Sequence, residues 1–184
     1  MLNRQVAFEL LQQHTKSESL IKHALAVEAC MRAYAQKLGE DIEKWGTVGL
    51  LHDFDYEMYP NPPDHPEKGA VILQALGYPE DIIYAIKAHA EWTNCPRQSA
   101  MDKALFACDE LAGFITAVAL VRPDKKIQGM EPRSVRKKMK DKAFARSVSR
   151  EDIVNGAQEL GVDLDEHITF CIRAMEEVAG SLGL

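Results

Sequence analysis

The chain has 184 residues, of which 46% are hydrophobic and 27% are charged, and its formal net charge is −6. This composition is typical of a folded globular protein, and the length suits one well-buried core better than two domains. No segment approaches the roughly 18 to 20 uninterrupted apolar residues that a membrane span needs. The N-terminal residues lack the short apolar core of a signal peptide, so we expect a cytoplasmic protein.

Helical periodicity dominates the sequence, and the alternation of period two that marks a half-buried strand is nearly absent. Ser17 or Ser19 is placed to cap the second helix, Gly39 to end it, and Asp41 to cap the third. A loop over residues 54–64, which holds three of the eight prolines, follows the third helix. The helices predicted in this part of the chain cover about residues 3–14, 17–38 and 42–53.

The second part of the chain is predicted to be helical as well. Asp64, His65 and Pro66 look like a cap followed by a first-turn proline, which would open the next helix. We therefore predict an all-α fold, in which a core over about residues 15–121 is followed by a C-terminal helical extension over about residues 122–184. The further helices cover about residues 65–77, 80–90, 99–121, 149–160 and 164–180, with short helical pieces over residues 132–146.

Some side chains of metal-ligand type lie at predicted helix ends or on apolar helix faces. His52 and Asp53 stand side by side at the end of an apolar run, where burying an imidazole and a carboxylate without partners is costly. A shared divalent metal ion removes that cost, because imidazole nitrogens and carboxylate oxygens are both natural ligands of such ions. The pattern therefore indicates a metal site inside a helical bundle. The candidate ligands are His23, His52, Asp53, His65, His89 and Asp109.

The two remaining histidines and the cysteines are assigned no chemistry. His14 follows the first helix in a polar stretch and His167 lies near the start of the last helix, so both are expected to be ordinary satisfied residues. The cysteines are far apart and form no Cys-x-x-Cys pair, so they are expected to be small core thiols. They are Cys30, Cys95, Cys108 and Cys171.

The order of the candidate ligands resembles the H…HD…D signature of the HD superfamily of metal-dependent phosphohydrolases. The resemblance is carried by His23 in a helix, by His52-Asp53 after Gly-Leu-Leu, and by Asp109 in Ala-Cys-Asp-Glu-Leu. It covers about residues 19–115. It implies an HD-domain helical bundle in which these four residues hold one metal ion, and we expect a single domain over the whole chain, residues 1–184.

A second group of residues resembles the binuclear members of the superfamily. His65, in His-Pro-Glu-Lys-Gly-Ala, and His89 match the additional histidines that complete a second metal site there, with the HD aspartate, here Asp53, bridging both ions. The alternative is a mononuclear site with both histidines lining its pocket. The HD pair continues here with Phe-Asp-Tyr-Glu, and the Gly-Tyr-Pro signature of the cyclic-dinucleotide phosphodiesterase branch is missing, so the resemblance does not extend to that branch.

The resemblance implies a cofactor of one or two divalent transition-metal ions, with iron or manganese favoured and cobalt, nickel, zinc or magnesium as alternatives. Asp53 is then a catalytic residue through its bridging position. Asp55 lies just beyond it and is expected either to act as a general base or to hold a metal-bound water, unless it is an ordinary loop carboxylate. Lys68, three residues after His65, is placed to contact a substrate phosphate, unless it is a solvated lysine.

The segment from Arg122 to Arg150 is strongly basic. It holds 11 of the 22 lysines and arginines against three acidic residues, a formal charge of +8 on an otherwise acidic protein. Such a local patch suits a phosphate-bearing ligand better than bulk nucleic acid. The other interpretation is that these side chains form a helical face exposed to solvent without a ligand.

The resemblance, together with the basic segment, implies a metal-dependent phosphohydrolase that acts on a nucleotide-like or other small phosphate ester. Tyr56, Tyr59 and Trp92 are expected near the pocket, either to stack on a base or to cap the core. Two other functions use the same features: a di-iron oxygenase of the HD fold, and a non-catalytic, metal-stabilised regulatory module that works through the basic segment. We expect a small phosphorylated partner, with no membrane and no nucleic-acid partner, and leave the oligomeric state open.

Overall fold

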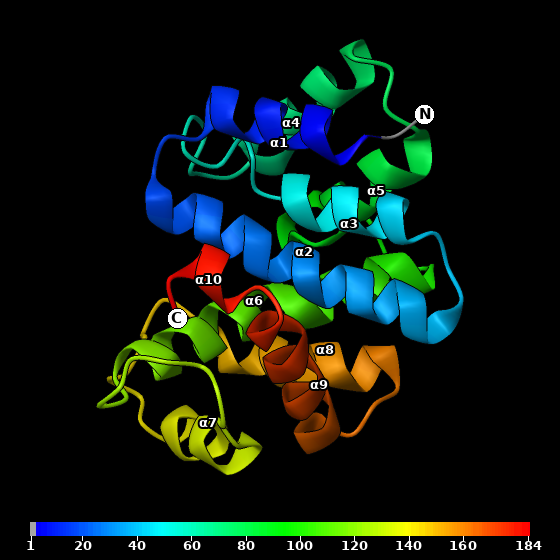
Figure 1. Ribbon diagram of the computed structural model, residues 1–184. Helices are drawn as coiled ribbons and strands as arrows, with labels where there is room; N and C mark the ends of the chain where they lie inside the picture. Colours follow the sequence, from blue (N-terminus) through cyan, green and yellow to red (C-terminus); the bar gives the residue numbers. More distant parts are fainter. Residues whose placement is uncertain (1–2) are drawn as a thin grey trace.

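The computed structural model describes residues 3–184 and confirms the predicted all-α class, with helices and no strand in that range (Figure 1). None of the helices in residues 3–184 combines the length and the apolar character needed to cross a membrane. A short 3₁₀ helix, η1, covers Glu91–Thr93. The α-helices are α1 (Arg4–His14), α2 (Glu18–Leu38), α3 (Ile42–Leu51), α4 (Asp64–Ala75), α5 (Glu80–Ala88), α6 (Ala100–Leu120), α7 (Pro132–Met139), α8 (Arg150–Leu160), α9 (Leu164–Glu176) and α10 (Ala179–Leu182).

Side-chain caps fix several helix ends where the sequence predicts them. Asp41 accepts a hydrogen bond from the backbone N of Lys44 at 3.0 Å and so caps α3. Ser99 and Asp102 form a complete capping box at the start of α6. Gly39 ends α2 in the left-handed conformation, with a φ of 72° that favours glycine.

The two longest helices, α2 and α6, lie across the middle of the molecule (Figure 1). Helix α3 packs closely along α2, because Gly49 has no side chain to separate them: a Cβ atom there would lie 2.9 Å from the Cα of Glu28. Helix α5 packs against both α3 and α6. The ends of α3 and α5 are therefore held against the middle of α2 and α6.

The C-terminal extension packs on the other side of α2 and α6. Helix α8 lies against α6, helix α9 contacts both long helices, and α10 returns to α2. One buried apolar cluster contains Val27 and Leu111 from the long helices together with Ile153 and Ile172 from the extension. The core is thus continuous between the two parts, and the single domain over residues 1–184 stays a prediction.

Two predicted helices differ in detail from the structure. The backbone is not helical at His65, whose ψ is 135°, so the regular turns of α4 begin only at Pro66. The physical reason is the proline itself, which disfavours the helical conformation in the residue before it. The last predicted helix is divided at Val178, and of the pieces predicted over residues 132–146 only α7 is helical.

Candidate metal centre

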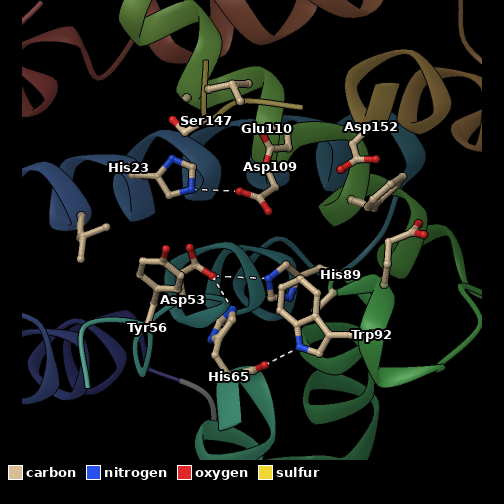
Figure 2. Close-up of a pocket in the computed structure, with 16 residues that line it drawn as sticks. His23, Asp53, Tyr56, His65, His89, Trp92, Asp109, Glu110, Ser147 and Asp152 are labelled. Atoms are coloured by element: carbon tan, nitrogen blue, oxygen red, sulfur yellow. Dashed lines mark hydrogen bonds and ion pairs between the residues drawn. The ribbon is translucent and has the colours of Figure 1, made fainter. Parts of the chain in front are cut away.

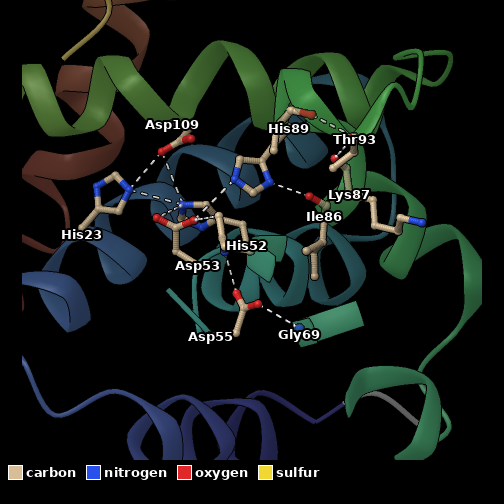
Figure 3. A network of polar contacts seen from close by, with 12 residues as sticks. His23, His52, Asp53, Asp55, Gly69, Ile86, Lys87, His89, Thr93 and Asp109 are labelled. Carbon is tan, nitrogen blue, oxygen red and sulfur yellow. Dashed lines mark hydrogen bonds and ion pairs between the residues drawn. The ribbon is translucent and has the colours of Figure 1, made fainter. Parts of the chain in front are cut away.

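The candidate ligands come from five helices or their ends and meet at one place (Figure 2, which labels His65, and Figure 3, which labels the others). Two of them stand in long helices, His23 in α2 and Asp109 in α6, and the others stand at helix ends. His52 and Asp53 follow directly on α3, His65 precedes the regular turns of α4, and His89 follows α5. The predicted convergence of these elements is therefore present in the structure.

A first group consists of His23, His52, Asp53 and Asp109, whose ligand atoms all lie within 4.8 Å of one another. Oδ1 of Asp109 lies 3.0 Å from Nε2 of His23 and 3.4 Å from Nε2 of His52. Nε2 of His52 also lies 3.3 Å from Nε2 of His23 and 3.5 Å from Oδ2 of Asp53. These are the residues that the HD signature assigns to one ion.

A second group consists of Asp53, His65 and His89. The other carboxylate oxygen of Asp53, Oδ1, lies 3.2 Å from Nε2 of His65 and 3.4 Å from Nε2 of His89. Asp53 therefore belongs to both groups, with one oxygen directed at each. This is the arrangement that a bridging carboxylate requires.

Hydrogen bonds on the far side of the His52 and His89 rings fix which nitrogen carries the proton of the neutral form. Nδ1 of His52 donates to the carbonyl of Gly49 at 2.8 Å, and Nδ1 of His89 donates to the carbonyl of Ile86 at 2.5 Å. Because a carbonyl oxygen only accepts, these Nδ1 atoms carry the protons of the neutral rings. Each Nε2 then presents a lone pair to the cluster, which is the form that binds a metal ion.

The donor set fits a divalent cation. Nε2 of His52 faces another imidazole nitrogen and two carboxylates at 3.3–3.5 Å, so these electron-rich atoms need a proton or a cation between them. Burial lowers the pKa of His52, but the nearby carboxylates outweigh it and leave that pKa raised. The carboxylates thus create a field that favours positive charge, and a divalent ion satisfies it with several ligands at once.

Asp55 and His65 form a supporting pair beneath the cluster. Oδ1 of Asp55 accepts from Nδ1 of His65 at 2.7 Å, and its Oδ2 accepts from the backbone N of Gly69 at 2.8 Å. Burial lowers the pKa of His65, but hydrogen bonds to Asp53 and Asp55 outweigh it and raise that pKa to about 9. Gly69 is needed at this point, since a Cβ there would lie 2.7 Å from the carboxylate carbon of Asp55.

The predicted general-base role of Asp55 does not fit this placement. Its side chain is fully buried, both carboxylate oxygens are engaged, and it is not among the residues that line the pocket. Asp55 is instead a positioning residue that holds the ring of His65. The sequence showed only that it follows the HD pair, whereas the turn after α3 decides which side of the cluster it faces.

The predicted phosphate contact of Lys68 is also corrected. Lys68 is exposed and does not line the pocket. The prediction assumed that His65 and Lys68 share one face of a regular helix, but the backbone break at His65 removes that register. Lys68 is therefore a surface lysine in this structure.

An open pocket of about 400 Å³ lies beside the cluster (Figure 2). Its lining contains no lysine or arginine among the described residues, so the expected phosphate contact of the basic segment is not present there. Arg150, for example, uses its guanidinium group to bind the carbonyls of Ala145 and Val148, which shapes the turn before α8. The lining residues are Leu20, His23, Asp53, Tyr56, His65, His89, Ala90, Glu91, Trp92, Phe106, Asp109, Glu110, Gly113, Ser147, Val148 and Asp152.

Two aromatic residues expected near the pocket, Tyr56 and Trp92, do line it, and Tyr59 does not. Trp92 is 46% exposed, and its Nε1 donates to the carbonyl of His65 at 2.6 Å. This bond fixes the indole ring next to the second ligand group, with ring centroids of Trp92 and His65 6.2 Å apart. Trp92 therefore offers a fixed flat surface to a ligand.

Sequence reasoning missed several acidic and polar lining residues, among them Glu110, Ser147 and Asp152. Burial and the neighbouring Asp109 raise the pKa of Glu110 to about 7, although a hydrogen bond from the backbone N of Ser149 opposes the shift. The Asp-Glu pair at the end of the HD signature was a signal for Glu110. No local pattern placed Ser147 or Asp152 at the site: Asp152 reaches it because α8 packs on α6, and Ser147 lies in the turn just before α8.

The residues assigned no chemistry lie away from the cluster or in the core. His167 is buried and forms hydrogen bonds with the hydroxyl of Tyr34 at 2.6 Å and the carbonyl of Ala107 at 2.8 Å. His14 contacts the sulfur of Met58 at 3.4 Å. The thiols of Cys30, Cys108 and Cys171 are buried near one another in the core, and Cys95 is half-buried.

The sequence was also compared with models of known protein families. A family model described as HD domain matches residues 20–113, about half of the chain. The chain belongs to the HD domain family. The resemblance to the HD superfamily is thus confirmed. The HD domain family is part of a superfamily of metal-dependent hydrolases.

Curated relatives named Ribonuclease Y are similar to the same share of the chain. The protein of Nitratidesulfovibrio vulgaris (strain DP4) is 36% identical over 101 residues, which are 53% of this chain and 18% of that protein. The protein of Desulfotalea psychrophila is 31% identical over 100 residues, covering 52% and 18%. The protein of Lawsonia intracellularis is 31% identical over 101 residues, covering 53% and 19%. The match thus spans less than a fifth of each relative, and no solved structure matches the chain.

Proposed function

We propose that this protein is a metal-dependent phosphohydrolase that cleaves a phosphate ester of a small, nucleotide-like molecule. The observation that carries the proposal is the position of Asp53, whose two oxygens face two separate groups of ligands beside an open pocket. One group is His23, His52, Asp53 and Asp109, and the other is Asp53, His65 and His89.

The ligands would hold one or two divalent transition-metal ions, with iron or manganese favoured. Such ions neutralise phosphoryl oxygens and lower the pKa of water toward neutrality when bound. Gly49, Ile86 and Asp55 accept hydrogen bonds from Nδ1 of His52, His89 and His65, so in each of these rings it is Nε2 that would bind an ion. Within residues 3–184 no lysine or arginine lines the pocket, and the histidines that line it are the candidate metal ligands, so no further cationic side chain is left there to neutralise the phosphate. Substrate binding is therefore expected to depend on the ions.

The pocket suits a compact substrate with a flat ring. A cavity of about 400 Å³ has the size of a small-ligand site, and the indole of Trp92 is held in place beside the ligands. Binding to a long nucleic acid depends on basic side chains that follow its backbone, and the pocket offers none among the described residues. These features favour a single nucleotide over RNA, although the relatives are named as ribonucleases.

The proposal is tested with protein purified without added metal, whose metal content is measured first. Hydrolysis of nucleoside mono-, di- and triphosphates, cyclic nucleotides, dinucleoside polyphosphates, ribose 5-phosphate and a short RNA is then followed with each candidate metal. We expect release of phosphate or nucleotide from at least one small ester, its loss on chelation, and its return with manganese or iron. Cleavage of RNA alone would replace the small-molecule substrate with a nuclease function. Oxygen uptake without any ester cleavage would favour the di-iron oxygenase.

A further inference from the structure

Part of the pocket wall comes from outside the segment that matches the HD domain family. The family match ends at residue 113, whereas Ser147, Val148 and Asp152 line the pocket. Figure 2 shows Ser147, Glu110 and Asp152 along one wall, with Asp53, Tyr56 and His65 across the pocket from them. The metal ligands all lie within the matched segment, so Ser147, Val148 and Asp152 are the part of the pocket lining that lies outside it.

The position of Asp152 on that wall is fixed by contacts at the start of α8. Its backbone N donates to Oγ of Ser149 at 3.1 Å. The backbone N of Ser149 in turn donates to Oε2 of Glu110 at 2.8 Å, which ties the start of α8 to α6 next to the metal ligand Asp109. Helix α8 also lies very close to α6, because Gly156 meets Ala107 without a side chain between them. Asp152 is thus held at a set position relative to the metal centre.

Asp152 differs from Asp53, Asp109 and Glu91 in that, among the described residues, no histidine or arginine is paired with it. Asp53 and Asp109 face the histidines, Glu91 pairs with Arg97 at 3.0 Å, and Glu110 accepts the bond from Ser149. Within residues 3–184 the carboxylate of Asp152 forms no ion pair with a lysine, arginine or histidine. An ionised carboxylate only accepts hydrogen bonds, so a ligand group that faces it must be a donor.

We propose that Asp152 selects nucleotides whose base carries an exocyclic amino group. The inference rests on the proposed function and names the substrate class for that site. The phosphate would lie at the metal centre and the base against Trp92, which lines the same pocket as Asp152. An amino group donates to the carboxylate, whereas a base without it leaves the carboxylate facing a carbon-bound hydrogen and loses a charge-assisted hydrogen bond.

The test uses two pairs of nucleotides that differ only by an amino group: guanosine and inosine monophosphate, and adenosine and purine riboside monophosphate. For at least one pair we expect the amino form to have a kcat/KM about 10-fold to 100-fold higher. The Asp152→Ala variant should bring that ratio close to one. The Glu151→Ala variant is the matched control, because Glu151 lies beside Asp152 in the first turn of α8 but is exposed and outside the pocket, and it should retain the ratio.

A binding measurement separates this inference from the proposed function. The indole of Trp92 is 46% exposed and that of Trp45 only 3%. A change in the fluorescence of Trp92 when a nucleotide is added therefore reports that the nucleotide occupies the pocket, whether or not it is hydrolysed. Because each variant is compared on two ligands, the ratio of dissociation constants does not depend on how much of the protein is folded. Equal affinity and equal kcat/KM within both pairs would overturn the inference, as would discrimination that survives in Asp152→Ala. Failure to hydrolyse any ester, ribose 5-phosphate included, would instead overturn the proposed function.

Discussion

At the scale of single residues, the site depends on where each proton lies. Nδ1 of His52, His65 and His89 is bound on the side away from the cluster, so each ring directs Nε2 toward Asp53 or Asp109. Two of these partners are backbone carbonyls, which no substitution removes. The third is Asp55, so that carboxylate is the point at which the orientation of a ligand can be changed by mutation.

We expect Asp55→Asn to weaken metal binding about 10-fold to 100-fold. An asparagine cannot accept from both His65 and the backbone N of Gly69, because one of its two polar atoms is a donor. Either the bond to Gly69 is lost, or the proton of His65 is moved to Nε2, where it faces Asp53. Calorimetric titration with manganese measures the change, and Asp64→Asn, in an exposed residue close by, is the control. Unchanged affinity in Asp55→Asn would contradict the positioning role.

The raised pKa of His65 gives a pH dependence with a definite sign. With a pKa of about 9, His65 in the metal-free protein is protonated at neutral pH, and a protonated ring cannot bind a metal ion. Affinity for the ion should therefore rise with pH, by up to about tenfold per unit, until the pH approaches that pKa. Metal titrations at about pH 6, 7 and 8 against a competing chelator test this, together with proton release measured in two buffers. Affinity that is flat across the range would show that no proton is displaced.

At the scale of helices, the close contact between α2 and α3 positions the HD pair. Gly49 allows that contact, and its carbonyl also holds the ring of His52. Helix α3 ends only two residues later, at Leu51, so any shift of α3 is passed directly to His52 and Asp53.

Gly49→Ala should therefore destabilise the protein and disturb the site together. The added Cβ would lie 2.9 Å from the Cα of Glu28, so the helices must separate, at a cost of about 1 to 3 kcal/mol in the free energy of unfolding. Urea denaturation and metal affinity measure the two effects. Gly180→Ala is the matched control, because a Cβ there has no neighbour within 4 Å, and it should leave both nearly unchanged. Loss of stability without loss of metal affinity would show that α3 shifts without moving the HD pair.

At the scale of the whole molecule, the ligands join five helices that are distant in the sequence. Residues 23 and 109 are 86 positions apart and yet their side chains lie 3.0 Å from each other. A metal ion held there binds only the folded chain, so it should raise the free energy of unfolding.

Saturating metal should accordingly raise the Tm of the protein, with a gain of about 2.7 kcal/mol when the free ion is at one hundred times its Kd. Asp53→Ala should abolish this gain and the hydrolytic activity together, because Asp53 is shared by both ligand groups. Thermal unfolding with manganese and with a chelator provides the comparison. A variant whose Tm still rises with metal would show that the remaining ligands bind the ion without the shared carboxylate.

The sequence by itself determined the helical class and the set of ligand types. Both are read from local patterns: the spacing of apolar side chains sets the helices, and His52-Asp53 at the end of an apolar run requires a partner for buried polar groups. The confirmed membership of the HD domain family rests on the same residues. Helix bounds were predicted well wherever a cap or a left-handed glycine marks them, as at Asp41 and Gly39.

Only the tertiary structure decided which side chains face the pocket. Asp55 turns beneath the cluster and Lys68 stays at the surface, because the path of the chain after α3 and the break at His65 set their directions. Asp152 enters the wall because α8 packs on α6. The orientation of a loop and the docking of a distant helix depend on contacts between residues far apart in the chain, and local periodicity holds no information about those contacts.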